Sequence, residues 1–357
     1  MQKTEQKFFL AANSAEGFIS YFADSYIPRE WRAYIIKGGP GTGKSSFMKY
    51  LAAKASDKGY SVILCPCSSD PDSLDGVIIK ETKTVILDGT APHVVEPVLA
   101  GACENIINLG EFWDSEKLFS NAKKIAETAE QNSKLHKTAS VYLSAAGELL
   151  YDNLKLSRLA VNRTSAIKTA NRLACRLLPV KTDREGREFI RFIGGTTPKG
   201  IISFSRTVTD YYKNIVAIED KFGGASGEIM SRIRTVALKN GYDIITLKNP
   251  LLPNELIDHI LVPELSLAFV TENEFAHFDT DVRRIHARRF TSREIVKKYK
   301  ARMIFNKRVS KQLLLGAVNT LVLAKSVHDR LEKFYINSMD FKALSNFAVK
   351  KAQEIIR

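Results

Sequence analysis

A glycine-rich run between an apolar segment and a segment of helix formers carries the clearest chemistry in the sequence. It follows the apolar residues 34–36 and has the spacing G-x-x-x-x-G-K-[ST] of a Walker A phosphate loop. Glycines tolerate positive φ and close approach to a phosphate, and the N–H groups at a helix start attract anions. We therefore expect the run to bind the phosphates of ATP. The expected contact residues are Gly38, Gly39, Pro40, Gly41, Thr42, Gly43, Lys44, Ser45 and Ser46.

Three side chains are expected to neutralise the phosphates of the nucleotide or to bind its Mg²⁺ ion. Lys44 would neutralise the β- and γ-phosphates, and Ser45 would ligate Mg²⁺. The apolar segment 84–87 ends in Asp88, which would hold the hydration shell of the same ion. Gly89 stands where many motor ATPases carry a glutamate that polarises water. The pattern therefore favours a slow ATPase or a kinase over a fast motor.

Further acidic residues are candidates for orienting water or acting as a base. Asp70 and Asp72 follow the second expected strand, at the edge where α/β sheets bind ligands. A turn capped by these aspartates is an equally good interpretation. Glu111 is a third candidate base. His93 would either orient a phosphate or water, or serve as a structural histidine.

The chain contains an internal repeat, which predicts its organisation. Gly17 matches Gly200 at an offset of 183, Gly59 and Tyr60 match Gly241 and Tyr242 at 182, and the order of matches is kept. Each half is expected to hold an α/β unit, over about 7–112 and 190–288, followed by a helical segment, over about 115–178 and 291–357. We predict two P-loop NTPase-like domains, 1–180 and 181–357, with mostly parallel sheets, packed as a pseudo-dimer.

The second half is predicted to have lost the phosphate loop. At an offset of 182, Lys44 falls on Ser226 and Ser45 on Gly227, and at an offset of 183 Thr271 stands where Asp88 does. Acidic residues in the matching segment would repel a triphosphate. We therefore expect a pseudo-NTPase that packs on the first half, binds a partner, or donates an arginine to the first site.

The charge of the chain and its cysteine content indicate which partners and which cellular compartment to expect. The chain has 357 residues and a net charge of +14, and residues 281–311 hold twelve basic residues against two acidic ones. This stretch would bind an anionic partner, such as nucleic acid or a phosphorylated ligand, or form a solvated face. The four cysteines are too scattered for a disulfide framework, and no long apolar run suggests a membrane span or signal peptide. We expect a cytoplasmic protein with reduced thiols and no membrane partner.

Four phrases of the sequence resemble a poorly characterised bacterial family, found mainly in Firmicutes. They are the runs 38–45, 70–76, 88–93 and 108–114. The family consists of tandem P-loop proteins described as ATPase or nucleotide-kinase-like. The resemblance implies ATP binding at residues 38–46 and names no substrate. The degenerate second loop departs from the family pattern.

Three functions remain open on the sequence alone. The first is a Mg²⁺-dependent ATPase that works as a slow switch through its first-half site. The second is a kinase that transfers the γ-phosphoryl group to a small molecule or a nucleotide. The third is a nucleic-acid-binding module that holds ATP as a structural ligand. The sequence leaves open whether the protein forms a homo-oligomer.

Overall fold

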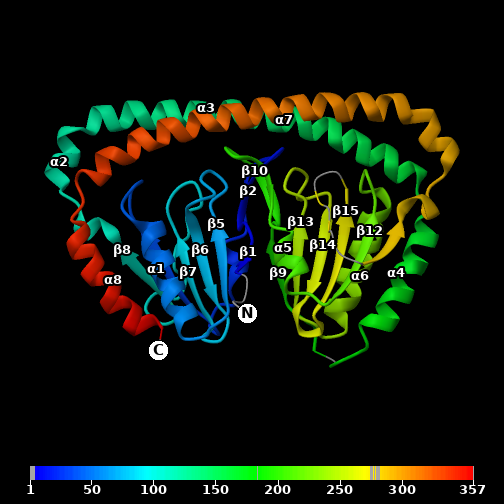
Figure 1. Cartoon of the computed structure of the whole chain (residues 1–357), viewed down its shortest axis with the longest axis horizontal. Coiled ribbons are helices and arrows are strands. Elements are labelled where there is room, and N and C mark those ends of the chain that lie inside the picture. Colours follow the sequence, from blue (N-terminus) through cyan, green and yellow to red (C-terminus); the bar gives the residue numbers. More distant parts are fainter. Residues whose placement is uncertain (1–4, 183, 274–275, 277, 279–281, 357) are drawn as a thin grey trace.

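The computed structural model describes residues 5–182, 184–273, 276, 278 and 282–356. Over these residues it contains two six-stranded mixed sheets, one in each half of the chain (Figure 1). The first sheet has the strand order β1 (Gln6–Lys7), β5 (Val62–Pro66), β6 (Leu74–Ile79), β7 (Thr84–Asp88), β4 (Arg32–Lys37), β8 (Glu104–Asn108). The second has the order β9 (Glu188–Arg191), β13 (Ile244–Lys248), β14 (Ile257–Val262), β15 (Leu267–Glu272), β12 (Asn214–Glu219), β16 (Arg283–His286).

The two sheets have the same topology, which confirms a duplicated α/β fold. Each is mostly parallel, with one antiparallel strand: β6 lies between β5 and β7, and β14 between β13 and β15. A hairpin precedes each sheet's central strands, β2 (Ala11–Ser14) with β3 (Gly17–Ser20) and β10 (Gly194–Thr197) with β11 (Gly200–Ser203). Gly17 and Gly200 turn these hairpins at φ 100° and 101°, so even the turns repeat.

Helices follow the strands in the expected segments. The sheet helices are α1 (Lys44–Asp57), α5 (Arg206–Thr209) and α6 (Gly224–Lys239); the later ones are α2 (Ser115–Ser120), α3 (Ala122–Ala160), α4 (Arg163–Leu177), α7 (Arg293–Ile336) and α8 (Phe341–Ile355). Short 3₁₀ turns are η1 (Ala23–Ser25), η2 (Leu109–Phe112), η3 (Pro263–Leu265) and η4 (Ala287–Phe290). The Asp114, Asn162, Ser292 and Asp340 side chains cap the amides that open α2, α4, α7 and α8.

The helical segments are exchanged between the two halves. Helices α3 and α7 run along each other across both sheets, so that α4 packs on α6 of the second half and α8 on α1 of the first (Figure 1). Backbone hydrogen bonds join the two chain segments at each end of the α3–α7 pair. The Asp114 N–H donates to Ser338 O at 2.7 Å and the Asp340 N–H to Phe112 O at 2.8 Å. The equivalent pairs at the other end are Asn162 with Phe290 and Ser292 with Ala160.

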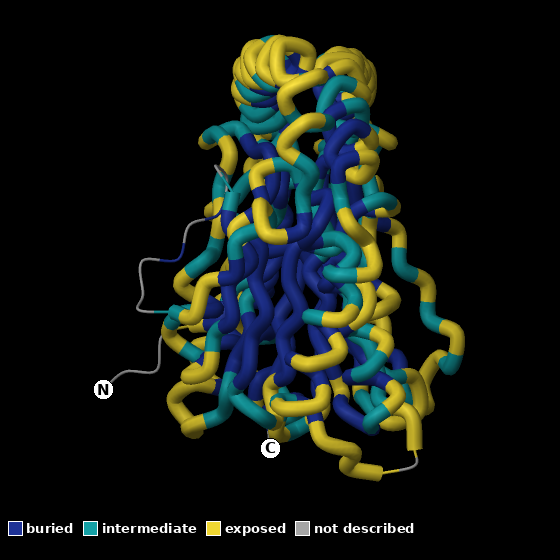
Figure 2. The backbone as a smooth tube through the Cα atoms, turned by 90° about the vertical axis from the view of Figure 1, so that its right-hand side faces the viewer, coloured by how far each residue is buried: buried dark blue, intermediate teal, exposed yellow. Residues whose placement is uncertain are grey.

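Burial follows this layered plan. The backbone of the sheets is buried, and the crossing helices are exposed along much of their length (Figure 2). One apolar cluster joins Phe47 and Leu51 of α1 to Leu344 and Ala348 of α8. Helix α1 therefore buries its apolar face against a helix from the other half of the sequence, and α6 does the same against α4.

The loops before α1 and α6 differ in length. Gly43 and Gly223 occupy the same left-handed position before their helices, at φ 89° and 81°. The segment between strand and helix is 38–43 in the first half and 220–223 in the second, two residues shorter. The predicted match of Lys44 with Ser226 is therefore wrong, because the helix starts align Lys44 with Gly224 and Ser45 with Ala225.

Candidate functional site

The glycine loop, residues 38–43, connects β4 to α1 in the conformation of a tight turn. Gly41 and Gly43 have φ of 69° and 89°, which a side chain would strain. The buried Thr42 hydroxyl donates to the Gly39 carbonyl at 2.8 Å. Pro40 is half-buried in this loop. The loop thus presents its backbone at the start of a 14-residue helix, where N–H groups and the helix dipole favour an anion.

Lys44 reaches back over the loop from the first turn of α1. Its ammonium donates to the carbonyls of Gly38 at 2.9 Å and Gly39 at 2.8 Å. Its Nζ also lies 3.6 Å from Asp88 Oδ2, at the end of β7, and both side chains are nearly buried. The structure therefore brings together the two expected charged residues. Their pairing leaves a cation and a carboxylate side by side next to the loop amides.

Ser45 and Ser46 take different positions on α1. The Ser45 hydroxyl accepts a hydrogen bond from the Leu74 N–H at 3.0 Å, which ties α1 to the start of β6. Ser46 is exposed. Leu74 immediately precedes Asp75. The contact therefore also fixes the start of β6, which carries the Asp75 carboxylate.

A buried group of three side chains lies behind Lys44. Asp75, Asp88 and His93 each offer a ligand atom within 4.8 Å of the others. Burial raises the pKa of Asp75 to about 7, and the nearby charge of Asp88 adds to the rise. Burial lowers the pKa of His93. The sequence places Asp75 in the acidic run 70–76, whose carboxylates are candidates for a base or a secondary Mg²⁺ ligand, but does not predict its burial beside Asp88 and His93.

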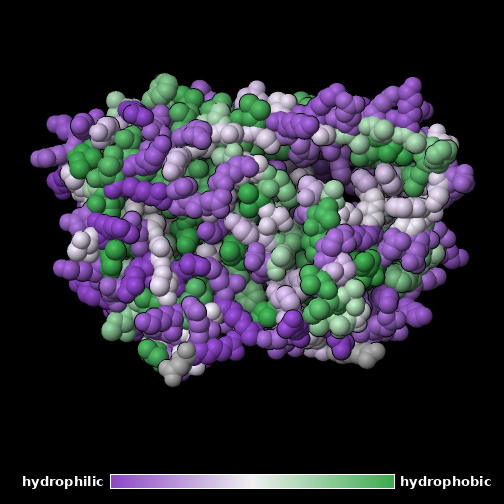
Figure 3. Space-filling view, turned by 180° about the vertical axis from the view of Figure 1, so that it is seen from behind, coloured by the Kyte–Doolittle hydropathy of each residue, from purple (hydrophilic) through white to green (hydrophobic). Residues whose placement is uncertain are grey.

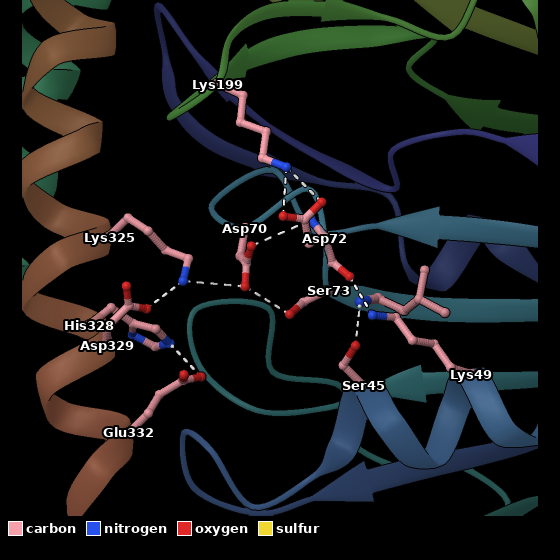
Figure 4. Close-up of polar contacts among 11 residues, drawn as sticks. Ser45, Lys49, Asp70, Asp72, Ser73, Lys199, Lys325, His328, Asp329 and Glu332 are labelled. Atoms are coloured by element: carbon pink, nitrogen blue, oxygen red, sulfur yellow. Dashed lines mark hydrogen bonds and ion pairs between the residues drawn. The ribbon is translucent and has the colours of Figure 1, made fainter.

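The three candidate bases lie in different environments. Asp70 accepts a hydrogen bond from the Ser73 hydroxyl at 2.8 Å, next to the Ser45–Leu74 contact (Figure 4). Asp72 is exposed and paired with Lys199 at 2.6 Å. Glu111 is exposed within η2. Asp70 is therefore the candidate base with the most direct connection to the first turn of α1.

The end of α7 covers the glycine loop, a feature that sequence reasoning missed. A Cβ built on Gly39 would lie 2.4 Å from Cε1 of Tyr335, and one built on Gly41 would lie 2.9 Å from the Glu332 carbonyl oxygen. Lys325, two turns earlier, pairs with Asp70 at 3.5 Å and with Asp329 (Figure 4). A space-filling view from behind shows a hollow under the crossing helices on the side of the first half (Figure 3). The second half thus contributes a lysine, a tyrosine and a glutamate to the first site.

The basic stretch 281–311 lies elsewhere. Its described part, residues 282–311, spans β16, η4 and the start of α7, over the second sheet (Figure 1). Arg284 pairs with Glu272 at 2.9 Å and Arg302 with Asp152 at 2.7 Å. Arg288 and Arg289 are exposed. The stretch therefore presents a largely exposed basic surface on the second half, while α7 reaches the glycine loop only at its other end.

Comparison with known proteins returns no relatives. No family model, no curated protein and no solved structure matches this chain. No helix among the described residues is long and apolar enough to cross a membrane. The second half of the chain provides an internal comparison for the site.

In the second half, a carboxylate of the chain occupies the helix start. Asp220 is buried, and its Oδ2 accepts hydrogen bonds from the N–H groups of Ala225 and Ser226, both at 2.8 Å. Its Oδ1 accepts from the Phe222 N–H at 3.2 Å. The amides that would face a phosphate therefore already bind an anion. Asp258 matches Asp75 in the strand pattern, but Thr271 replaces Asp88, so the pair of carboxylates is absent there.

Proposed function

We propose that this protein is a Mg²⁺-dependent ATP-binding protein with one working site, the glycine loop of the first half, and that it acts as a slow ATPase switch. One observation carries the proposal. The loop amides at the start of α1 are accompanied by Lys44 and Asp88, whereas the equivalent amides of α6 bind Asp220. A cation and a carboxylate beside loop amides that no side-chain carboxylate occupies suit a magnesium–triphosphate. A carboxylate of the chain bound to those amides excludes the triphosphate.

The roles follow from the positions of the side chains. Lys44 would leave the Gly38 and Gly39 carbonyls and bind the terminal phosphates. Ser45 and Asp88 would hold Mg²⁺ through oxygen atoms, which this ion prefers. Asp70 would orient the attacking water, with Lys325 balancing its charge. The resemblance to tandem P-loop proteins supports the same assignment of the loop.

The switch would work through α7. Tyr335 and Glu332 lie against Gly39 and Gly41, so a phosphate that reshapes the loop also pushes on the end of this 44-residue helix. Because α7 begins over the second sheet, the change reaches the other half without a hinge in between. Nucleotide state would thus alter the surface of the second half, including its exposed basic residues.

ATP binding and turnover by the purified protein test the proposal, with Lys44→Ala as the variant. Lys54→Ala is the matched control, because Lys54 lies on the same helix with an exposed side chain. We expect one ATP per chain, slow Mg²⁺-dependent hydrolysis, and loss of both in Lys44→Ala alone. Binding without turnover would favour the kinase, to be followed by a screen of phosphoryl acceptors. Equal binding by the wild type and Lys44→Ala would refute the proposal.

A further inference from the structure

His93 lies in the interior next to two carboxylates and has no hydrogen-bond partner among the described residues. Its side chain is 7% exposed, and neither ring nitrogen forms a hydrogen bond. Its Nε2 lies 3.9 Å from Asp75 Oδ1. Buried polar atoms are normally paired, so an imidazole in this position requires an explanation. An unpartnered imidazole nitrogen with two carboxylates within 4.8 Å offers a set of donor atoms that a metal ion can bind.

The two carboxylates come from neighbouring antiparallel strands. Gly76 pairs with Leu87, so Asp75 and Asp88 lie opposite each other at the next position of β6 and β7. Asp88 Oδ1 accepts hydrogen bonds from the Thr90 N–H at 2.9 Å and the Thr90 hydroxyl at 2.6 Å. These bonds orient the carboxylate through Oδ1, while Oδ2 faces the Lys44 ammonium 3.6 Å away. Outer contacts of this kind position metal ligands in proteins.

The segment that carries His93 is also held in place. The Lys37 ammonium donates to the carbonyls of Gly89 at 2.9 Å and Val95 at 2.8 Å, on either side of His93. The imidazole stacks on Phe22 with ring centroids 4.6 Å apart and planes 12° from parallel. The ring is therefore fixed in orientation rather than free to turn away from the carboxylates.

We propose that Asp75, Asp88 and His93 bind a divalent transition-metal ion of the Mn²⁺ class, in the absence of nucleotide. The donor set decides the class of ion. Mg²⁺ takes oxygen ligands almost alone, whereas an imidazole together with carboxylates suits Mn²⁺ and its first-row neighbours. Three protein ligands leave coordination positions open for water or a ligand oxygen. The ligand atoms, within 4.8 Å of one another, need only small side-chain shifts to close on one ion.

This metal site goes beyond the proposed ATP site and does not depend on it. It shares Asp88 with the magnesium of that proposal, but its other ligands, Asp75 and His93, have no role there. Lys44 should affect ATP binding and metal binding in opposite directions, because its ammonium lies 3.6 Å from Asp88 Oδ2. A nearby cation strengthens phosphate binding and opposes metal binding. Loss of Lys44 should therefore weaken ATP binding and tighten Mn²⁺ binding.

The second half supplies matched controls. Asp258 is the buried counterpart of Asp75, and His259 is a buried histidine with an unpartnered Nε2 on the same strand. Thr271 stands in the place of Asp88. The second half therefore contains a buried carboxylate and a buried imidazole without the three-ligand group.

Titration of the 357-residue chain with Mn²⁺ in the absence of nucleotide tests the proposal. Binding is measured as the decrease in the electron paramagnetic resonance signal of free Mn²⁺. We expect one Mn²⁺ per chain, retained in excess Mg²⁺. His93→Gln and Asp75→Asn should each weaken binding by at least about tenfold, by comparison with the 10–100-fold cost of outer-shell changes. His259→Gln and Asp258→Asn should bind as the wild type does, and Lys44→Ala should bind several-fold more tightly.

Two results would overturn the metal site. One is the absence of stoichiometric Mn²⁺ binding by the wild type. The other is equal binding by wild type and His93→Gln, since oxygen atoms alone would then hold the ion. Thermal unfolding of each variant shows whether it is folded, and the Lys44→Ala variant keeps the test decisive because it changes none of the three ligands. A failure of ATP binding alone would leave the metal site intact.

Discussion

Phe9 and Phe192 exchange two backbone hydrogen bonds, one in each direction. The Phe9 N–H donates to Phe192 O and the Phe192 N–H donates to Phe9 O, both at 2.9 Å. The two residues occupy equivalent positions in the repeat, so each half makes the same contact with the other. Both side chains are fully buried. This reciprocal pairing is the signature of a two-fold interface, here formed within one chain.

A side chain at Gly43, the glycine before α1, should destabilise the fold. A Cβ at Gly43 would meet Leu344 of α8 at 2.9 Å, and φ there is 89°. Gly43→Ala should therefore lower the free energy of unfolding by about 2–4 kcal/mol, from left-handed strain and overpacking together. Gly59→Ala is the control, because Gly59 has φ of 81° with open space around it. Denaturant titration should show a loss of only about 1–2 kcal/mol for the control. Equal losses would mean that α8 yields to the new methyl group.

The carboxylate of Asp220 should stabilise the second half. It accepts three backbone N–H groups around the start of α6. Asp220→Ala should cost about 1–3 kcal/mol of unfolding free energy, in the range of lost helix caps and charge-assisted bonds. Asp220→Asn should cost less, because the amide oxygen still accepts. Asp210→Ala, at an exposed aspartate, is the control for denaturant titrations. A neutral effect of Asp220→Ala would show that water replaces the carboxylate at no cost.

The buried Asp258 should make stability depend on pH. Burial raises its pKa to about 7 from 3.8, against the opposing effect of the hydrogen bond from Asn249. The folded state therefore holds a proton that the unfolded state has released, so this contribution is complete below about pH 4 and is lost as pH rises through 7. At one pKa unit per ~1.4 kcal/mol, the loss is up to about 4 kcal/mol. Asp258→Asn should flatten the stability profile between pH 5 and 8, measured by denaturant titration. An unchanged slope would contradict the assignment.

The two halves should unfold together. Residues Asp114 and Ser338, like Asn162 and Phe290, hydrogen-bond across the exchange, and α4 and α8 each cover a helix of the opposite half. Neither sheet keeps its covering helix if the other half unfolds. We therefore expect one calorimetric transition for the whole chain, with calorimetric and van't Hoff enthalpies equal. Two resolved transitions would show that the exchanged helices detach at little cost.

The duplicated α/β plan was predictable because the repeat preserves both spacing and apolar runs, but the antiparallel strands β6 and β14 were not predicted. Gly17 and Gly200, or Tyr60 and Tyr242, locate equivalent turns and strand starts, and the motif at 38–45 locates the loop. The exchange of helices was not predictable from such matches, because a repeat leaves the same matches whichever sheet each helix covers. The placement of Lys325 and Tyr335 beside the loop depends on that exchange. The error over Ser226 came from a constant offset applied across a loop that lacks two residues.

The position of α8 has a consequence for synthesis on the ribosome. Most chains complete their N-terminal domain first, while the rest is still being made. Here the apolar face of α1, including Phe47 and Leu51, is covered by Ile355 and Ile356, which follow it in the sequence by about three hundred residues. The Lys58 ammonium even donates to the Ile356 carbonyl at 2.7 Å. The first sheet to be translated therefore closes only after α8 has been made, and the apolar face of α1 stays uncovered until then.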